Sequence, residues 1–538
     1  MKNISKPYRL ALPPPRLGFS RPSWHWLQAG LPWLLPLTIG VLWWIASHRH
    51  WMSAQILPTP ELVLQAGREL LAGELWQQLG VSLKRLAWGL QAGIFSGLAL
   101  GAWLGFSRLA ERLVLPTFSA LAQVPTLAWI PLFMLFFGIG ELLKLVVLIK
   151  AIIVPVTLHT LVGVRDAQPR LREAAAVLRL PRHLLLWRLI LPAALPAFLT
   201  GVRLALAQGW TSLLAVELLA SSEGIGYLMV QARQLFMLDI VFVCILVIGL
   251  VGAAMDRGIQ ALDRRLVHWP QQAAGELRRG TLRRSGAGQG WQFLQPWLLP
   301  LGLLAIWQAA SVGQWVDPAI LASPASVAVA LWDGLLDNSL TSALFASLQR
   351  TLAGLLLGGS LGFLLGLGLG LWRPAERLLG PSFAALRQVA IFAWVPLLTA
   401  WFGLGELAKV VFVGLAAFFP LLLATQRGIA SLPAQLTEAA IALRLSPWQR
   451  LRRLVLPGAA PSVFAGVRLA LIYAWLGTIG AEYFMPSDGG IGSLMIGAQQ
   501  LFRMDLVGAG MLLVGLTGAL LAAVGQRIEA RVTRWRHA

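Results

Sequence analysis

Residues 173–192 read EAAAVLRLPRHLLLWRLILP, and residues 438–457 read EAAIALRLSPWQRLRRLVLP. Both stretches begin with Glu-Ala-Ala, end with Leu-Pro and carry several arginines in between. The second stretch lies 265 residues after the first, and the same offset relates Gly-Val-Arg at residues 201–203 to Gly-Val-Arg at residues 466–468. Similarity at one fixed offset indicates a duplicated structural unit, so we expect two homologous halves.

Apolar residues dominate the rest of the chain. Of its 538 residues, 57% are hydrophobic and only 12% are charged, and the mean hydropathy is +0.70. A soluble domain carries about 25% charged residues, and Cys244 is the single cysteine. These values exclude an ordinary soluble enzyme, a disordered chain and a secreted disulfide scaffold. They fit an all-α polytopic membrane protein, in which each spanning helix needs about 20 apolar residues.

We expect about twelve transmembrane helices, six in each half. An even number of spans per half makes the halves parallel repeats, related by an axis along the membrane normal. The expected spans are residues 31–47, 85–105, 113–137, 142–163, 193–219, 238–257, 294–312, 350–371, 378–402, 407–426, 459–483 and 506–525.

The basic residues predict the orientation of these spans. Of the 44 Lys and Arg residues, 30 fall in segments that this topology puts on one side of the membrane, and five fall on the other side. Cytoplasmic loops are rich in Lys and Arg, so both termini are expected in the cytoplasm. The same loops account for the net charge of +21. On a soluble chain that charge would indicate a nucleic-acid partner, but none is expected here.

The topology divides the chain into two membrane domains with basic flanking segments. The alternative that the first apolar run is a cleaved signal peptide is disfavoured, because the run contains Pro32 and Pro36 and no Ala-x-Ala site follows it. The predicted boundaries are a basic cytoplasmic tail at 1–30, a first domain at 31–265, an Arg- and Gly-rich cytoplasmic linker at 266–290, a second domain at 291–530 and a basic tail at 531–538.

Glycines at every fourth position mark the second expected span of each half. In lipid, small residues at this spacing let two helices pack backbone to backbone, although a glycine in a water-exposed helix costs about 1 kcal/mol relative to alanine. We interpret these glycines as helix-packing residues, and a direct role in a permeation path is the alternative. The central members of the two rows are Gly93, Gly97, Gly101, Gly358, Gly362 and Gly366.

The two Glu-Ala-Ala stretches predict polar helices that project into the cytoplasm between the fourth and fifth spans of each half. Small alanines beside an acidic residue leave a smooth helix face that the groove of a partner can approach closely. The alternative is a loop whose charges only set the topology. Two copies in the same sequence context argue against that alternative.

The spacing of Glu-Ala-Ala and Leu-Pro resembles the EAA loop of ABC importer permeases, the binding-protein-dependent transport inner-membrane components. The sequence QVPTLAWIPLFMLFFGIGELLK at residues 123–144 and its copy QVAIFAWVPLLTAWFGLGELAK at residues 388–409 are similar to the taurine/alkanesulfonate/nitrate branch. Ordinary members of this family are a single half that dimerises. The chain therefore resembles two permease domains fused in tandem, with the type I importer fold.

This resemblance implies a transport subunit of the bacterial inner membrane and not an enzyme. It implies as partners two copies of a cytoplasmic ABC ATP-binding subunit, on which ATP and Mg act, and a periplasmic substrate-binding protein. The chain lacks the Gly-Lys-[Ser/Thr] of a Walker A motif, and it shows no metal-ligand cluster and no Ser/His/Asp constellation.

The resemblance also assigns the residues of the coupling loops. One departure from the family pattern is clear, because Arg179 and Arg444 stand where the family usually has glycine. The assigned coupling residues are Glu173, Ala174, Ala175, Arg179, Leu191, Pro192, Glu438, Ala439, Ala440, Arg444, Leu456 and Pro457.

Polar and aromatic residues inside the spans are candidates for a translocation pathway. A charge at mid-membrane costs roughly 3 kcal/mol on insertion scales, so such groups usually face a bundle interior or a wet cavity. The arginines of the set could instead lie at the cytoplasmic interface, the glutamates could cap helix packing, and the tryptophans could pack between helices. The candidates are Gln123, Arg203, Trp210, Glu217, Gln388, Arg468, Trp475 and Glu482.

The function expected from this reading is ATP-driven import of a small organic anion such as a sulfonate, a sulfate ester, taurine or a nitrate-like ion. The substrate class follows from the family branch alone, since the basic loops are explained by topology. A secondary transporter with two parallel six-helix halves is the alternative. It would need coupling carboxylates deep in the spans, whereas Glu217 and Glu482 lie near span ends, and it would not explain two EAA stretches.

Overall fold

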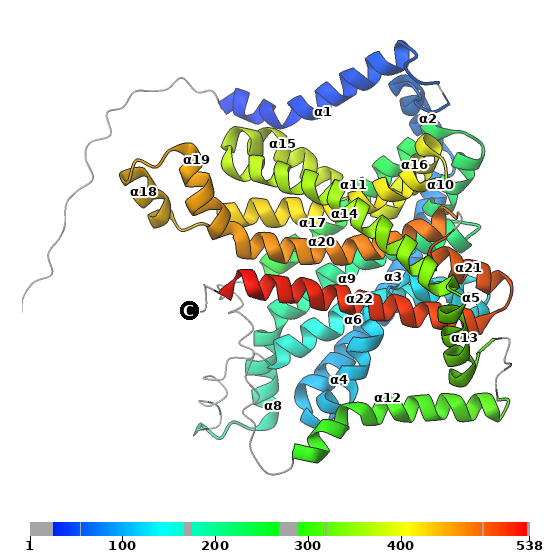
Figure 1. Cartoon of the computed structure of the whole chain (residues 1–538). Coiled ribbons are helices and arrows are strands. Elements are labelled where there is room, and N and C mark those ends of the chain that lie inside the picture. The colour runs from blue at the N-terminus through cyan, green and yellow to red at the C-terminus, as the bar shows by residue number, and fades with distance from the viewer. Residues whose placement is uncertain are drawn as a thin grey trace, which may run out of the picture.

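The computed structural model describes residues 25–53, 55–165, 175, 177–267, 289–315, 317, 320–486 and 489–534. The regular elements within this part of the chain are all helices. Long helices run between one end of the molecule, which carries α18 and α19, and an opposite end, which carries α10 and α21 (Figure 1). We call these the α18 end and the α21 end.

The two halves have the same order of elements. The first half contains α1 (His25–His48), α2 (Pro60–Ala72), α3 (Leu75–Phe106), α4 (Arg108–Gln123), η1 (Leu127–Trp129), α5 (Ile130–Phe137), α6 (Glu141–Arg165), α8 (Arg182–Leu184), η2 (Leu185–Ile190), α9 (Leu191–Ala220), α10 (Ile225–Gln234) and α11 (Leu238–Leu266). The second half contains α12 (Gln289–Val312), α13 (Pro324–Leu336), α14 (Ser339–Leu371), α15 (Arg373–Leu386), η3 (Ile391–Trp394), α16 (Val395–Phe402), α17 (Glu406–Ala430), α18 (Ala434–Ala442), α19 (Pro447–Arg450), η4 (Leu451–Val455), α20 (Leu456–Phe484), α21 (Ile491–Gln500) and α22 (Met504–Val532).

Eight helices of the described residues are long and apolar enough to cross a membrane, and ten spans result if each of two bent helix pairs counts as one. The expected spans at 113–137 and 378–402 correspond to the two bent helix pairs. In both places the chain breaks and bends, by 90° between α4 and η1–α5 and by 89° between α15 and η3–α16. The remaining two expected spans, 31–47 and 294–312, correspond to α1 and α12, which each contain two prolines.

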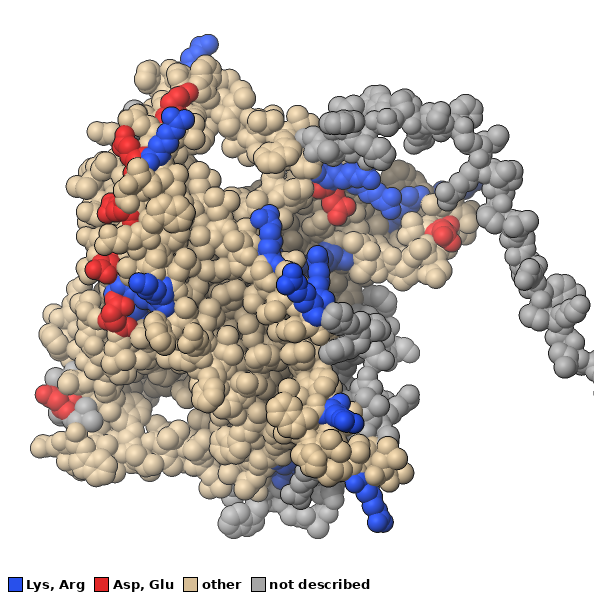
Figure 2. Space-filling view, turned by 180° about the vertical axis from the view of Figure 1, so that it is seen from behind, with Lys and Arg blue, Asp and Glu red and all other residues tan. Residues whose placement is uncertain are grey.

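The surface is mostly uncharged, as expected for helices that face lipid. Figure 2 shows a surface dominated by uncharged side chains, on which the acidic side chains gather mainly toward the α21 end. Large apolar side chains point outward from the long helices, for example Phe95 of α3 and Leu356 of α14. Water would disfavour such a surface, whereas hydrocarbon accommodates it. The outer surface therefore supports the assignment to a membrane.

The glycine rows lie where the second long helix of each half meets the next one. In the first half α3 packs along α6, and a Cβ added at Gly93 would lie 2.6 Å from Ile152 Cγ2. In the second half α14 packs along α17 even more closely, since a Cβ at Gly358 would lie 1.8 Å from the carbonyl oxygen of Gly414. The absence of side chains at these positions is what allows this separation of the helices.

The two halves interleave instead of standing side by side. Helix α1 packs on α15 of the second half, and α12 packs on α4 of the first half. The last helices cross over as well, because Gly249 of α11 faces Val389 and Gly515 of α22 faces Val124. A hydrogen bond of 3.0 Å from Trp401 Nε1 to the carbonyl of Ile56 adds a further contact between the halves. The chain therefore forms one membrane body with two related parts.

The close approach of α14 and α17 leads to a stability prediction. We expect Gly358→Ala to lower the stability of the purified chain by about 1–3 kcal/mol or more, because the added methyl group meets backbone that cannot rotate away. Gly368→Ala on the same helix is the control, since no heavy atom of the described residues lies within 4 Å of a Cβ there. The control should be neutral or slightly stabilising. Equal thermal-unfolding midpoints for both variants in detergent would contradict this packing.

Candidate coupling helices and translocation pathway

The second Glu-Ala-Ala stretch forms a helical hairpin at the α18 end. Helix α18 contains Glu438, Ala439 and Ala440, and α19 begins at a capping box in which Ser446 and Gln449 bond reciprocally to each other's backbone N–H. The π-helical segment η4 then leads into α20, which begins at Leu456-Pro457. The hairpin extends beyond the long helices of the bundle (Figure 1). Most residues of α18 and α19 are exposed.

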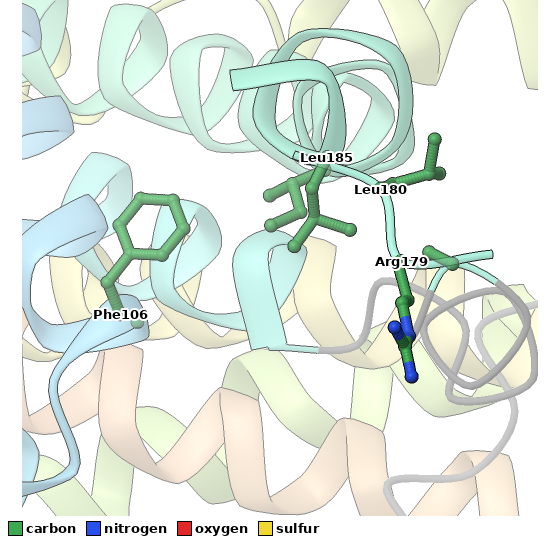
Figure 3. Close-up of a pocket in the computed structure, with 7 residues that line it drawn as sticks. Phe106, Arg179, Leu180 and Leu185 are labelled. Carbon is green, nitrogen blue, oxygen red and sulfur yellow. The ribbon is translucent and has the colours of Figure 1, made fainter. Parts of the chain in front are cut away.

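The first stretch is described only in part. Glu173 and Ala174 lie outside the described residues, whereas Ala175 is buried and borders a pocket together with Phe106, Arg179 and Leu185 (Figure 3). The continuation matches the second half, because α8 is followed by the π-helical segment η2 and then by α9, which begins at Leu191-Pro192. Single π-helical turns are frequent at functional sites, and both halves place one within the stretch, directly before its Leu-Pro.

Arg179 and Arg444 both adopt a backbone conformation that favours glycine. Their φ angles are 49° and 50°, in the left-handed region that glycine enters at no steric cost. A non-glycine residue held there costs of order 1–3 kcal/mol and persists only where its surroundings impose it. Both halves thus place an arginine in the left-handed conformation at the same position of the stretch.

Apolar side chains are exposed on both stretches outside the long helices. Ala440 and Ala175 are buried against their own chain, at 4% and 6% exposure, but Ala439 is exposed. Exposed apolar patches outside a lipid-facing belt indicate a protein-binding surface. The large apolar residues with high exposure here are Val177, Leu178 and Trp187 in the first half, and Leu436, Ile441, Leu443 and Trp448 in the second.

At the α21 end, the buried Glu217 belongs to an ion-pair cluster whose second carboxylate, that of Glu141, is exposed. Arg85 of α3 donates to Glu217 Oε1 at 2.9 Å and to both carboxylate oxygens of Glu141, at 2.6 and 2.8 Å. Ser82 donates to Glu217 at 2.9 Å, and the N–H of Gly226 donates to it at 3.1 Å. This cluster joins α3, α6, α9 and α10 at a single point.

The second half repeats the cluster residue by residue. Arg350 donates to Glu482 Oε1 at 2.8 Å and to both carboxylate oxygens of Glu406, at 2.7 and 2.6 Å. Ser347 donates to Glu482 at 2.7 Å, and the N–H of Gly492 donates to it at 2.7 Å. The side chains of Glu217 and Glu482 are fully buried. Their surroundings therefore favour the helix-packing interpretation of these two glutamates over contact with a substrate.

The partners of Glu217 and Glu482 in these clusters were not among the residues predicted from the sequence. The offset of the duplication relates Arg85, Ser82 and Glu141 to Arg350, Ser347 and Glu406. A search for polar residues repeated at this offset could therefore have found them. In the described residues no group of three or more His, Cys, Asp and Glu side chains is arranged to hold a metal ion. The buried carboxylates are instead neutralised by arginine, as buried charges require.

The predicted arginines pair with the last helix of their own half. Arg203 Nε lies 2.8 Å from Asp256 Oδ1, and Arg468 Nη1 lies 3.2 Å from Glu529 Oε2. Gln388 of the second half reaches the same Asp256, with Nε2 3.4 Å from Oδ2. The structure thus brings Arg203 and Gln388 together through a shared acid. Gln123 instead places its backbone carbonyl beside α22, 3.7 Å from a Cβ added at Gly518.

The two predicted tryptophans are buried between helices. Trp210 and Trp475 are 3% and 2% exposed. Trp475 Nε1 donates to the carbonyl of Val514 at 3.2 Å, and Trp210 Nε1 lies 3.7 Å from a Cβ added at Gly252. Each indole thus packs against the last helix of its half, which favours a packing role over substrate stacking.

These features define a multi-pass helical transport protein of two interleaved, homologous halves, with an exposed helical hairpin between the fourth and fifth long segments. The chain belongs to the family of the binding-protein-dependent transport system inner membrane component, whose sequence profile matches residues 93–268 and again residues 358–537. This match confirms two tandem permease domains with the type I importer fold.

Known permeases each resemble about half of the chain. A putative aliphatic sulfonates transport permease protein, SsuC of Bacillus subtilis, is 37% identical over 256 residues, which are 47% of this chain and 92% of SsuC. The taurine transport system permease protein TauC of Escherichia coli is 35% identical over 263 residues, 47% of this chain and 96% of TauC. The nitrate import permease protein NrtB of Synechocystis is 28% identical over 221 residues, 39% of this chain and 80% of NrtB.

The ion-pair clusters lead to a second prediction. We expect Glu217→Gln to destabilise the chain by about 3 kcal/mol, because removal of one partner from a buried ion pair leaves the other charge poorly compensated. Glu111→Gln is the control, since Glu111 pairs with the exposed Arg165 and such a pair contributes at most about 1 kcal/mol. Thermal unfolding in detergent measures both losses. A loss for Glu217→Gln no larger than for Glu111→Gln would show that the cluster does not hold the helices together.

Proposed function

We propose that this chain forms the complete transmembrane part of an ATP-driven importer for a small organic anion. Membership of the permease family supports the transport role, and the names of the similar proteins, which refer to aliphatic sulfonates, taurine and nitrate, support the substrate class. The proposed domains are residues 31–265 and 291–530, joined by a cytoplasmic linker at 266–290. The tails at 1–30 and 531–538 complete the chain.

The proposal depends most on one observation. Two copies of an EAA stretch lie between the fourth and fifth long helices of their halves, and the described parts expose large apolar side chains outside the bundle. In the proposed assembly each stretch fits a groove on one cytoplasmic ATP-binding subunit. The coupling residues would be those named from the sequence, and Ala439, which is exposed, would lie in the contact. ATP and Mg would act on the partner subunits alone.

In this proposal the α18 end faces the cytoplasm of a bacterium, and the α21 end faces the periplasm. Both termini are then cytoplasmic in the inner membrane, as the distribution of Lys and Arg predicts. A periplasmic binding protein would deliver the substrate to the α21 end. Closure of two ATP-binding subunits would move the two EAA stretches together and rock the halves between inward- and outward-facing states.

The side-chain contacts support the alternative function, that of a secondary transporter, less well than that of an ATP-driven importer. Such a protein needs membrane carboxylates that can load and release a proton or a cation. Glu217 and Glu482 are the buried candidates, and each is already held by an arginine and a serine. These contacts favour a structural role for the two glutamates.

The fused organisation predicts the composition of the assembly. The purified complex should contain one copy of this 58.4 kDa chain and two ATP-binding subunits, since both coupling stretches are on one polypeptide. Native mass spectrometry measures the composition directly. Two copies of the chain in each complex would contradict the proposal that one chain forms the whole pathway.

The coupling role predicts the effect of charges on the EAA stretches. We expect Ala174→Asp and Ala439→Asp together to abolish retention of the ATP-binding subunit, because each adds a carboxylate that costs on the order of 1–3 kcal/mol if the contact leaves it unsatisfied. Insertion should be normal because the sites lie outside the bilayer. Single variants should lose unequal amounts, since the flanking residues of the two copies differ.

Ala530→Asp provides the matched control. It makes the same change at an exposed position near the end of α22 on the same side of the membrane, and it should retain subunit binding. The measurements are co-purification of the ATP-binding subunit and ATP hydrolysis stimulated by the binding protein. Full subunit binding and full stimulated ATP hydrolysis in the double variant would contradict the coupling role and would mean that the EAA stretches only set the topology.

A further inference from the structure

Lys150 is a cationic side chain inside the membrane-spanning helix α6. Its ammonium group donates to the carbonyl oxygen of Val124 at 2.7 Å and lies 3.3 Å from Thr126 Oγ1. Both partners are uncharged. Ionisable residues in a span are costly, face the bundle interior or a wet cavity, and mark substrate pathways. The lysine therefore needs an explanation beyond packing.

The lysine lies at the break of a bent helix and at the junction of the two halves. Val124 and Thr126 stand in the 90° bend between α4 and η1. The second half packs against this bend, since a Cβ at Gly515 of α22 would lie 2.9 Å from Val124 Cγ2, and one at Gly480 of α20 would lie 3.2 Å from Leu127 Cδ1. Transporters commonly bind their substrates at the repeat interface beside discontinuous helices.

A buried indole N–H lies near Lys150 and is a second hydrogen-bond donor at this place. The Lys150 ammonium is 5.7 Å from a ring centre of Trp129, and Trp129 Nε1 is buried and has no hydrogen-bond partner among the described residues. A buried N–H that stays unsatisfied costs about 1–3 kcal/mol. An ammonium group and an unsatisfied indole N–H together are suited to the oxygens of an anion.

An aromatic row leads from this point toward the α21 end. The ring centres of Trp129 and Phe133 are 5.6 Å apart, and those of Phe133 and Phe137 are 6.0 Å apart. Phe137 is 39% exposed at the end of α5, which lies near α21 (Figure 1). Apolar side chains along this row would contact the hydrocarbon part of a small organic anion.

The fold itself does not require the charge. The offset of the duplication places Leu415 of α17 at the position equivalent to Lys150. The second half thus forms the same helix pair with a neutral residue. The lysine is a feature of the first half alone, and a functional role accounts for it better than an architectural one.

We propose that Lys150 and the Nε1 of Trp129 form an anion-binding site in the translocation pathway, which takes the oxyanion group of a singly charged organic substrate. This inference deepens the proposed function and rests on it. It assigns recognition of the negative charge to one half of a duplicated protein.

The test measures anion binding by the full chain without its partners. Ethanesulfonate, and ethyl methyl sulfone as a neutral analogue, are titrated at fixed ionic strength while thermal unfolding of the purified chain is recorded. We expect ethanesulfonate to stabilise the native chain more than the sulfone does. In Lys150→Gln, which retains a donor for the Val124 carbonyl but loses the charge, its apparent affinity should fall at least tenfold.

Lys150→Arg should retain binding, and Leu415→Gln should leave it unchanged as the matched control in the second half. Lys150→Leu copies the residue of the second half and checks that the fold tolerates the loss of charge. Equal ethanesulfonate affinity in the native chain and in Lys150→Gln, or no stabilisation of the native chain by ethanesulfonate, would overturn the inference. ATP-driven uptake by the complete complex is measured separately. Anion binding without such uptake would contradict the proposed function and leave the anion site supported.

Discussion

The backbone contact between α3 and α6, and its copy between α14 and α17, is the constraint on which the architecture of both halves depends. At Gly101 and Gly358 an added Cβ would meet a backbone carbonyl oxygen at 2.6 and 1.8 Å. Contacts of this kind fix the separation and the register of two helices over several turns. They leave little freedom for one helix to slide past the other.

The ion-pair clusters extend this rigidity to a third helix. Arg85 joins α3 to Glu141 of α6 and to Glu217 of α9, and Arg350 does the same in the second half. In each half three helices are therefore fixed to one another at the α21 end. The EAA stretch lies between the second and the third of them. Movement of that stretch would displace the three helices as one body, which is what alternating access between two halves requires.

Most of the architecture could be predicted from the sequence, because each motif in the first half could be compared with its copy in the second half. The helices, the parallel halves, the glycine rows and the EAA stretches all follow from apolar runs and one offset. The breaks at α4–η1 and α15–η3 were missed. Pro125 marks the first break, but Ala390 occupies the same place in the second, so local sequence alone does not define the bend.

The ion pairs between residues far apart in the chain could not be predicted from the sequence either. Arg85 and Glu217 are 132 residues apart, and neither periodicity nor composition indicates that they meet. The exchange of α1 and α12 between the halves depends on packing over still longer separations. Lys150 differs from these residues because it has no charged copy in the second half. The equivalent position there is Leu415, and this difference between the halves is what singles out the lysine.

The central claim is that ATP hydrolysis on partner subunits drives transport through this single chain. The most direct measurement is uptake of labelled ethanesulfonate by proteoliposomes that contain the chain and its ATP-binding subunit, with the binding protein outside and ATP inside. The account predicts accumulation that requires both ATP and the binding protein and that persists when proton and sodium gradients are collapsed. Accumulation that follows an ion gradient and proceeds without ATP would contradict it.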